Sequence, residues 1–157
     1  MAIDDLQAFI AELERRGELK RVRVEVDAEL EITEIADRVM KVGGPALLFE
    51  RVKGSPYPLL INAMGSERRM ALAFGAESLD AKAAEVEELI AWAWKQVRGF
   101  NLFSAIPEAL PKLPVALSLL PRKVRKALCQ EVRSDEEGFG SLPVLKCWPK
   151  DGGRFFT

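Results

Sequence analysis

The stretch that decides the fold is residues 30–50, LEITEIADRVMKVGGPALLFE. Its first half predicts a helix over residues 32–42, because apolar residues recur at the spacing of one helical face. These residues are Ile32, Ile35, Ala36, Val39 and Met40. Gly43-Gly44-Pro45 ends the helix, since glycine accepts the left-handed conformation found there and proline cannot continue a helix. The apolar run at residues 46–50 then predicts a strand.

Upstream of this stretch, the sequence predicts a helix followed by a strand. Over residues 19–26 valines alternate with charged residues toward the end, which is typical of a strand with one face in water. The preceding residues predict an amphipathic helix that Asp4 caps and Gly17 ends. Its apolar face consists of Leu6, Phe9, Ile10 and Leu13.

Downstream, a second short apolar run at residues 59–63 predicts another strand. The segment Lys53-Gly54-Ser55-Pro56 between the two apolar runs has the composition of a turn. A short helix is expected over residues 65–74, with Gly75 at its end.

The longest predicted helix covers residues 80–98 and ends at Gly99. Its apolar stripe consists of Val86, Leu89, Ile90, Ala93 and Val97. Residues 1–99 are therefore expected to form an α+β domain, with a small mixed sheet and helices packed against it. The expected core residues are Phe9, Leu13, Ile35, Val39, Leu48, Leu60, Val86 and Ile90.

The pattern changes after residue 99. Residues 100–126 are interrupted by four prolines and are interpreted as a proline-rich connector with short helical turns. Strand-like stretches follow at residues 129–132 and 144–148. Two short strands cannot bury a core of their own, so residues 127–157 are interpreted as the start of a further domain.

Composition excludes several classes of function. The 157 residues include 23 basic and 24 acidic side chains, a balance that argues against nucleic-acid binding. No run approaches the roughly 18 apolar residues of a membrane span, and no secretory signal is present. Cys129 and Cys147 form no CxxC pair, which favours reduced thiols in a cytoplasmic protein. The sequence contains no histidine, which excludes Ser-His-Asp triads, Cys-His pairs and histidine-based zinc sites.

The segment Gly65-Ser66-Glu67-Arg68-Arg69 has the ingredients of an anion site. Backbone N–H groups at a helix start, a hydroxyl and two guanidinium groups could hold a phosphate. The alternative interpretation is a capped surface helix with solvated arginines.

Other polar clusters have simpler structural interpretations. The acidic runs at residues 85–88 and 135–137 could pair carboxylates, but the first is typical of a solvated helix face and the second of a hairpin loop. Trp92 and Trp94 cannot share one helical face, so one is expected in a core and the other at a domain or subunit contact. A basic stretch lies within residues 112–126 but has few aromatic neighbours. The residues alone thus predict a soluble α+β domain without a catalytic set.

Several stretches taken in order resemble one family, the UbiD decarboxylases. The resemblance extends over nearly the whole chain. The matching stretches are residues 30–38, 44–50, 52–56, Gly65 followed by residues 69–75, then 129–132 and 142–153.

The resemblance implies a division into an N-terminal α/β domain at residues 1–99, a connector at 100–126 and a truncated start of the flavin-binding split β-barrel at 127–157. It also implies an activity. The family removes carboxylate as CO2 from aromatic or α,β-unsaturated acids, with ubiquinone or menaquinone precursors as typical substrates. Full-length members use prenylated FMN with a divalent metal such as manganese and with potassium.

The family's metal ligands and proton-transfer residues lie beyond the end of this chain, so no catalytic or metal-binding residue is carried over. Only Thr157 corresponds to a position near the cofactor. The parent family is a carboxy-lyase family, whereas this chain alone is expected to be inactive and to bind no cofactor tightly. Self-association through the C-terminal segment is expected, because apolar ends such as Phe155-Phe156 favour a partner.

Two alternatives remain open. The chain could be a non-catalytic interaction domain that binds a partner chain. It could also be a small flavin- or nucleotide-binding module that uses Ser66, Arg68 and Arg69.

Overall fold

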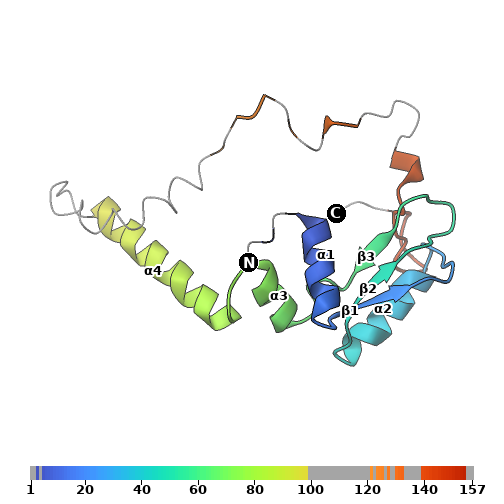
Figure 1. Ribbon diagram of the computed structural model, residues 1–157, viewed down its shortest axis with the longest axis horizontal. Helices are drawn as coiled ribbons and strands as arrows, with labels where there is room; N and C mark the ends of the chain where they lie inside the picture. Colours follow the sequence, from blue (N-terminus) through green and yellow to red (C-terminus); the bar gives the residue numbers. More distant parts are fainter. Residues whose placement is uncertain are drawn as a thin grey trace. The chain divides into compact units, whose positions relative to one another are not determined.

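The structure, a computed structural model, describes residues 3, 5–98, 121, 123–125, 127, 130–132 and 139–154 (Figure 1). The chain divides into two compact units. The first consists of Met1–Leu79 together with Asp135–Thr157, and the second of Asp80–Ser134. The division into residues 1–99, 100–126 and 127–157 stays a prediction.

A small mixed sheet lies at the centre of the first unit, as predicted. Its strands are β1 (Leu19–Val22), β2 (Ala46–Phe49) and β3 (Leu59–Ile61), in the order β1-β2-β3. β1 and β2 run parallel, and β2 and β3 run antiparallel. The parallel pair requires a crossover connection, which the helix α2 (Glu31–Lys41) supplies.

The first strand is shorter than predicted. β1 pairs only with β2, and the register ends at the pair Val22↔Phe49 because β2 ends there. Val24 is 66% exposed. Val26 is buried and makes a separate bridge to Val52. The alternating pattern therefore identified the inward-facing Val26 correctly, but it did not reveal where the partner strand stops.

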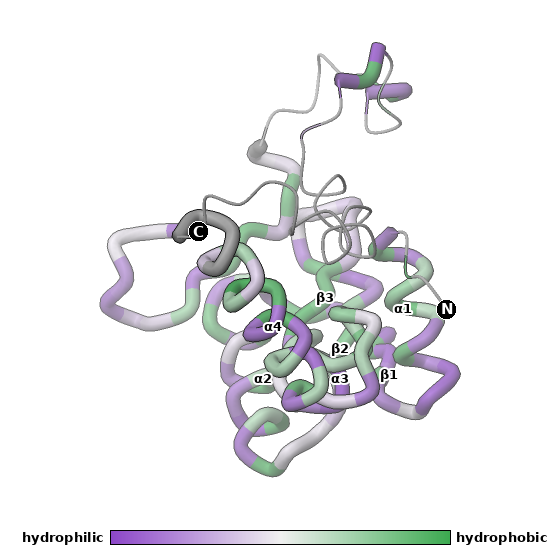
Figure 2. The backbone as a smooth tube through the Cα atoms, turned by 90° about the vertical axis from the view of Figure 1, so that its left-hand side faces the viewer, coloured by the Kyte–Doolittle hydropathy of each residue, from purple (hydrophilic) through white to green (hydrophobic). Residues whose placement is uncertain are grey.

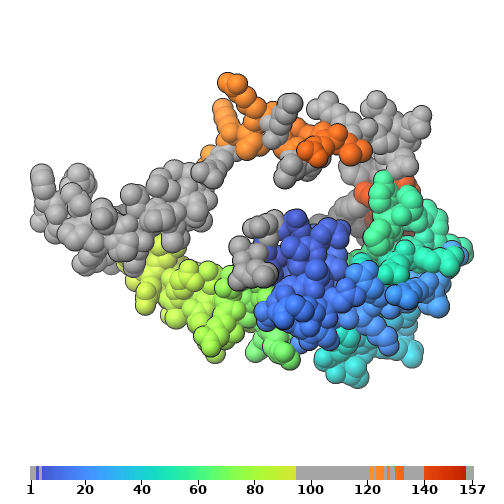
Figure 3. All heavy atoms as spheres, viewed as in Figure 1, coloured from blue at the N-terminus to red at the C-terminus, as the bar shows by residue number. Residues whose placement is uncertain are grey.

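Both faces of the sheet are covered by helices, and for this reason every residue of β2 is buried. On one face, Leu47 and Phe49 of β2 join a cluster that includes Ile32 of α2. On the other face, Ala46 packs in a cluster with Phe9 and Leu13 of α1 (Leu6–Arg15). Figure 3 shows these segments, coloured blue to green, in contact with one another.

The helix ends follow the predicted local signals with one correction. α1 is capped by Asp5, one residue later than predicted, whose Oδ1 accepts a hydrogen bond from the Ala8 N–H at 2.7 Å. Gly17 follows α1 with a φ of +71°, a left-handed conformation that glycine adopts without steric cost. The short helix is α3 (Glu67–Ala73), and the longest helix is α4 (Leu79–Arg98).

The predicted core is only partly correct. Phe9, Leu13 and Leu48 are buried, whereas Ile35, Val39 and Leu60 are half-buried. Two residues of α4 were wrongly assigned to the core, since Val86 is 43% exposed and Ile90 is 50% exposed. Hydrophobic and hydrophilic residues do alternate along α4 (Figure 2). Among the described residues of the second unit, however, α4 is the only helix or strand, and no other described element of that unit covers its apolar stripe.

Several predicted features lie outside the described residues. These are most of the connector at 100–126, much of the strand-like stretch at 129–132, the acidic run at 135–137, and Thr157. Among the helices that the structure does describe, none combines the length and the apolar character needed to cross a membrane.

Candidate functional site

The C-terminal segment, residues 139–154, is docked within the first unit against residues 28–32 (Figure 1). The Lys146 N–H donates to the Ala28 carbonyl at 3.2 Å, and the Leu30 N–H donates to the Lys146 carbonyl at 3.0 Å. Lys146 Nζ also lies 2.8 Å from Glu29 Oε1. Leu145 packs against the cluster that contains Ile32. The segment is therefore held by backbone, ionic and apolar contacts together.

Residues 144–148 were predicted as a strand, and this prediction is wrong. They make a one-residue bridge, Glu29↔Lys146, and then turn. The turn is closed by Asp151 Oδ2, which accepts hydrogen bonds from the Cys147 N–H at 3.1 Å and the Trp148 N–H at 2.8 Å. A side chain that captures these backbone donors competes with a strand ladder, and Pro149 offers no N–H of its own.

We expect Leu145→Ala to loosen the docked segment without unfolding the sheet. Removing a half-buried leucine side chain costs about 1 kcal/mol, and this loss falls on the few contacts that hold the segment. Hydrogen exchange checks this expectation. The amides of Leu30 and Lys146 should exchange faster, while the amide of Glu50, which donates to Val22, should be unchanged. Equal exchange at all three amides would contradict it.

The predicted anion site at residues 65–69 is closed by a carboxylate of the chain itself. Ser66 caps α3, and its hydroxyl accepts a hydrogen bond from the Arg69 N–H at 3.2 Å. Arg68 Nη1 lies 3.1 Å from Glu18 Oε1, and Arg69 Nη1 lies 3.0 Å from Glu18 Oε2. The two guanidinium groups therefore bind Glu18. A flavin- or nucleotide-binding module that uses them would first have to displace this carboxylate.

The alternative of solvated arginines is correct only for Arg68. Arg69 is 1% exposed, and its Nε and Nη2 atoms are buried without a hydrogen-bond partner among the described residues. The loop closes tightly around it, since a Cβ at Gly65 would lie 1.7 Å from Asn62 Oδ1 and 3.2 Å from Arg69 Nη2. Only glycine fits at this position. Arg69 and Glu18 thus join α3 to the start of β1 as a structural contact.

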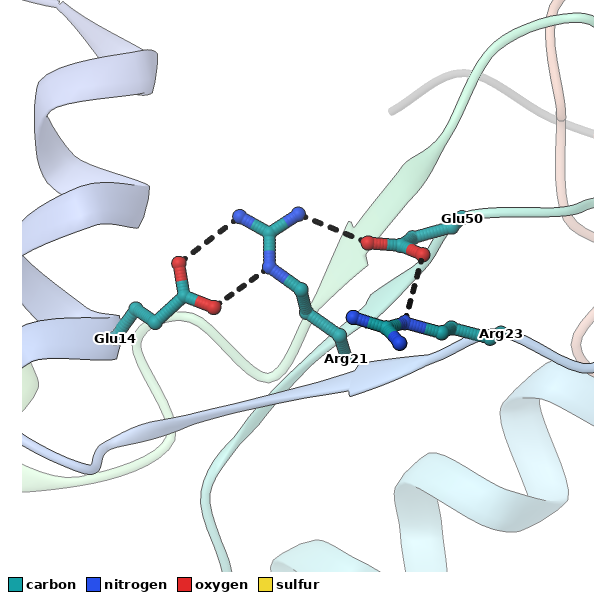
Figure 4. A network of polar contacts seen from close by, with 4 residues as sticks. All are labelled: Glu14, Arg21, Arg23 and Glu50. Atoms are coloured by element: carbon teal, nitrogen blue, oxygen red, sulfur yellow. Dashed lines mark hydrogen bonds and ion pairs between the residues drawn. The ribbon is translucent and has the colours of Figure 1, made fainter.

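Charged side chains on α1, β1 and the end of β2 form a surface network (Figure 4). Arg21 Nε and Nη2 bind the two carboxylate oxygens of Glu14 at 2.7 and 2.9 Å, and Arg21 Nη1 binds Glu50 Oε1 at 3.0 Å. Arg23 lies 3.6 Å from the other Glu50 oxygen. The hydrogen bond from Arg21 lowers the pKa of the Glu14 carboxyl. The Glu14 carboxylate is held by Arg21, and its lowered pKa does not suit a general acid.

A groove of about 590 Å³ lies between α1 and the residues that follow α3. Its floor is lined by small and apolar residues, including Ala8, Ala11 and Leu72. The two arginines at its rim, Arg15 and Arg16, both bind Glu12, at 2.7 and 2.6 Å. The hydrogen bonds from these arginines lower the pKa of Glu12 to about 2. The groove therefore offers no free guanidinium group to the phosphate of a flavin.

The described residues do not fit the metal ion that the resemblance implies either. No three His, Cys, Asp or Glu side chains lie close enough to hold a metal within the described ranges, and the sequence as a whole has no histidine.

A comparison with protein families gives a match to the 3-octaprenyl-4-hydroxybenzoate carboxy-lyase N-terminal domain over residues 10–90. The chain belongs to this family, the UbiD family. The match begins within α1 and ends within α4, and so it includes the sheet, α2, α3 and the Glu18–Arg69 contact. The docked segment at residues 139–154 lies outside it.

Individual relatives extend the similarity along the chain. An uncharacterized protein of Archaeoglobus fulgidus is 45% identical over 157 residues, which are all of this chain and 31% of the relative. The closed form of vanillic acid decarboxylase from Sedimentibacter hydroxybenzoicus superimposes with a TM-score of 0.68 at 27% identity, over 98% of this chain and 29% of that one. The chain thus spans about a third of the length of these UbiD relatives.

An evolved dimeric form of the UbiD-class enzyme HmfF from Pelotomaculum thermopropionicum was solved in complex with prFMN. It matches 56% of this chain and 19% of its own, at 35% identity and a TM-score of 0.46.

Proposed function

We propose that this chain is the N-terminal part of a prenylated-FMN-dependent decarboxylase that acts on aromatic or α,β-unsaturated carboxylic acids, such as ubiquinone or menaquinone precursors. The proposal is carried by the similarity to vanillic acid decarboxylase, which extends over 98% of this chain. The family match at residues 10–90 supports it independently. We further propose a cytoplasmic location, no nucleic-acid partner, and self-association through the C-terminal segment.

In this proposal the chain contributes a scaffold. Helices cover both faces of the sheet, and the contact between Lys146 and Glu29 holds the C-terminal segment against the residues that precede α2. The next residues lead to Thr157, the position proposed to lie near the flavin. Prenylated FMN, the divalent metal and potassium would be bound by parts of the full-length protein outside this chain.

The chain alone is expected to release no CO2. A pocket normally encloses about 70–90% of its ligand, and the described residues form neither a flavin-phosphate site nor a metal site. The assay incubates the purified chain with prenylated FMN, manganese and potassium, and measures CO2 release from a panel of aromatic and acrylic acids. Vanillic acid decarboxylase acting on vanillic acid is the positive control. Turnover by the chain above background would contradict the claim that it lacks the catalytic groups.

The role as a decarboxylase domain needs a test of its own. We expect the intact Archaeoglobus fulgidus relative to bind prenylated FMN. We expect a chimera, in which this chain replaces the matching part of that relative, to fold and to bind the flavin equally well. The replaced region is 45% identical to this chain over all 157 residues, a similarity high enough for the two to share one fold. The matched control is the relative without the part that this chain matches. Flavin binding by that truncated protein at the level of the intact one would argue against the proposal.

A further inference from the structure

Leu30, the residue that precedes α2, has a strained backbone. Its φ of +68° and ψ of −37° lie in the left-handed region, which a residue with a large side chain rarely adopts. The Glu31 N–H donates to the Glu29 carbonyl at 2.8 Å, so Leu30 is the central residue of a γ-turn of the rare, positive-φ type. Among the described residues, Asn62 is the other non-glycine residue with a positive φ, but asparagine tolerates this conformation.

The helix α2 does not by itself require this strain. The residue before a helix normally has an extended backbone, and its side-chain oxygen caps the first turn. Asp5 before α1 and Ser66 before α3 follow this rule, with φ values of −153° and −148°. Leu30 has no side-chain oxygen, and no side-chain cap hydrogen bond forms at the start of α2. The left-handed conformation of Leu30 therefore has its cause outside the helix.

The docked segment grips the chain at this strained turn. The Leu30 N–H donates to the Lys146 carbonyl at 3.0 Å, and the Lys146 N–H donates to the Ala28 carbonyl at 3.2 Å. Lys146 Nζ lies 2.8 Å from Glu29 Oε1, the side chain between these two bonds. Three consecutive residues are thus held by one residue that is 117 positions away from Glu29. The strained residue and the point of docking coincide.

The contacts that hold the docked segment are modest in comparison with the strain. The side chains of Glu29 and Lys146 are 47% and 24% exposed, and an ion pair so close to solvent contributes little. Leu145 adds a half-buried apolar contact. A left-handed conformation at a residue other than glycine changes an equilibrium by a factor of about 5–30. The strain at Leu30 is therefore large enough to bring the docked state near balance with a released one.

We propose that the docked segment and the turn at Leu30 form a two-state conformational switch. In the docked state Lys146 holds Leu30 in its left-handed conformation. In the released state water hydrates the Leu30 N–H and the Ala28 carbonyl, and Leu30 relaxes to the extended backbone that is usual before a helix, while the sheet stays folded. Because the strain favours release, weakening the Glu29–Lys146 ion pair with salt shifts the population toward the released state.

Hydrogen exchange of the intact 157-residue chain measures the release. The amide of Lys146 reports the docked state, and the amide of Glu50, which donates to Val22 within the sheet, is the internal reference. The decisive comparison is Leu30→Gly with Leu30→Ala. Both variants lack the rest of the leucine side chain, but glycine alone adopts a positive φ without steric cost. We expect the Lys146 amide to exchange about fivefold more slowly in Leu30→Gly than in Leu30→Ala, with the Glu50 amide unchanged.

Salt provides the second arm of the experiment. Raising sodium chloride from about 50 to about 500 mM should speed exchange of the Lys146 amide about twofold relative to that of Glu50. The control variant Glu29→Gln has no ion pair at this point and should show no such response. Equal Lys146 exchange in Leu30→Gly and Leu30→Ala would refute the role of strain. Equal acceleration of the Glu50 amide would show that the whole unit opens, and an undiminished salt response in Glu29→Gln would remove the ion pair as the trigger. Each of these results would overturn the proposal.

Discussion

Replacing Glu18 with alanine is expected to lower the free energy of unfolding by about 3–5 kcal/mol, although Glu18 lies at the surface end of its ion pair. The large effect is expected because its partner, Arg69, is buried. Arg69 is 1% exposed, and Glu18 is the carboxylate that binds its Nη1 atom. Without Glu18, the Arg69 charge stays buried and loses its counter-ion. Chemical denaturation of the chain and of the variant measures the loss.

Three further variants separate this explanation from a simple loss of packing. Arg69→Met removes the buried charge but keeps an apolar side chain, and it should cost no more than about 1 kcal/mol. The double variant should be clearly more stable than Glu18→Ala alone, because no unpaired charge remains. Glu14→Ala, which breaks the exposed pair with Arg21, should change stability little. If adding Arg69→Met did not restore stability to Glu18→Ala, the buried charge would not be the cause.

The second large effect is expected in the apolar core. Phe49 of β2 is 0% exposed and lies in the cluster between the sheet and α2. Phe49→Ala should lower the free energy of unfolding by about 3–5 kcal/mol, since it removes a buried ring and leaves a cavity. Denaturation monitored by circular dichroism measures this effect.

The matched control is Ile90→Ala on α4. The apolar stripe of α4 suggested a cost as large as that of a core residue, but Ile90 is 50% exposed. Its replacement should change the free energy of unfolding by no more than about 0.5 kcal/mol. A loss comparable with that of Phe49→Ala would mean that the Ile90 side chain is covered in solution.

Local signals in the sequence predicted most elements of the first unit. The stripe in α2, the glycines after the helices and the apolar runs of β2 and β3 depend on neighbouring residues, which a sequence displays directly. The early end of β1 depends on the length of β2, and the exposure of Val86 depends on what lies against α4. The length of a strand and the exposure of a side chain both depend on contacts between two elements. The periodic pattern of one element does not show those contacts.

In the candidate site, too, the contacts between distant residues could not be predicted from local sequence patterns. The sequence drew attention to Ser66, Arg68 and Arg69, but it gave no sign that Glu18 would bind both arginines. A weak signal was present, because Glu18 stands between the helix-ending Gly17 and the first residue of β1, where a polar side chain is close to the sheet edge. The docking of Lys146 beside Glu29 had no signal of this kind, since these residues are 117 positions apart.

That separation affects how the protein folds while it is being synthesised. All three strands of the sheet are present once Ile61 has left the ribosome, but Leu145 and Lys146 emerge much later. At a synthesis rate of about 5–20 residues per second, about 4–17 s pass between the synthesis of Ile61 and that of Leu145. During this interval the backbone groups of Ala28 and Leu30 lack their final partners, and the apolar cluster beside α2 lacks Leu145. A nascent chain stalled before residue 145 should therefore be more sensitive to protease near residues 26–30 than the released protein.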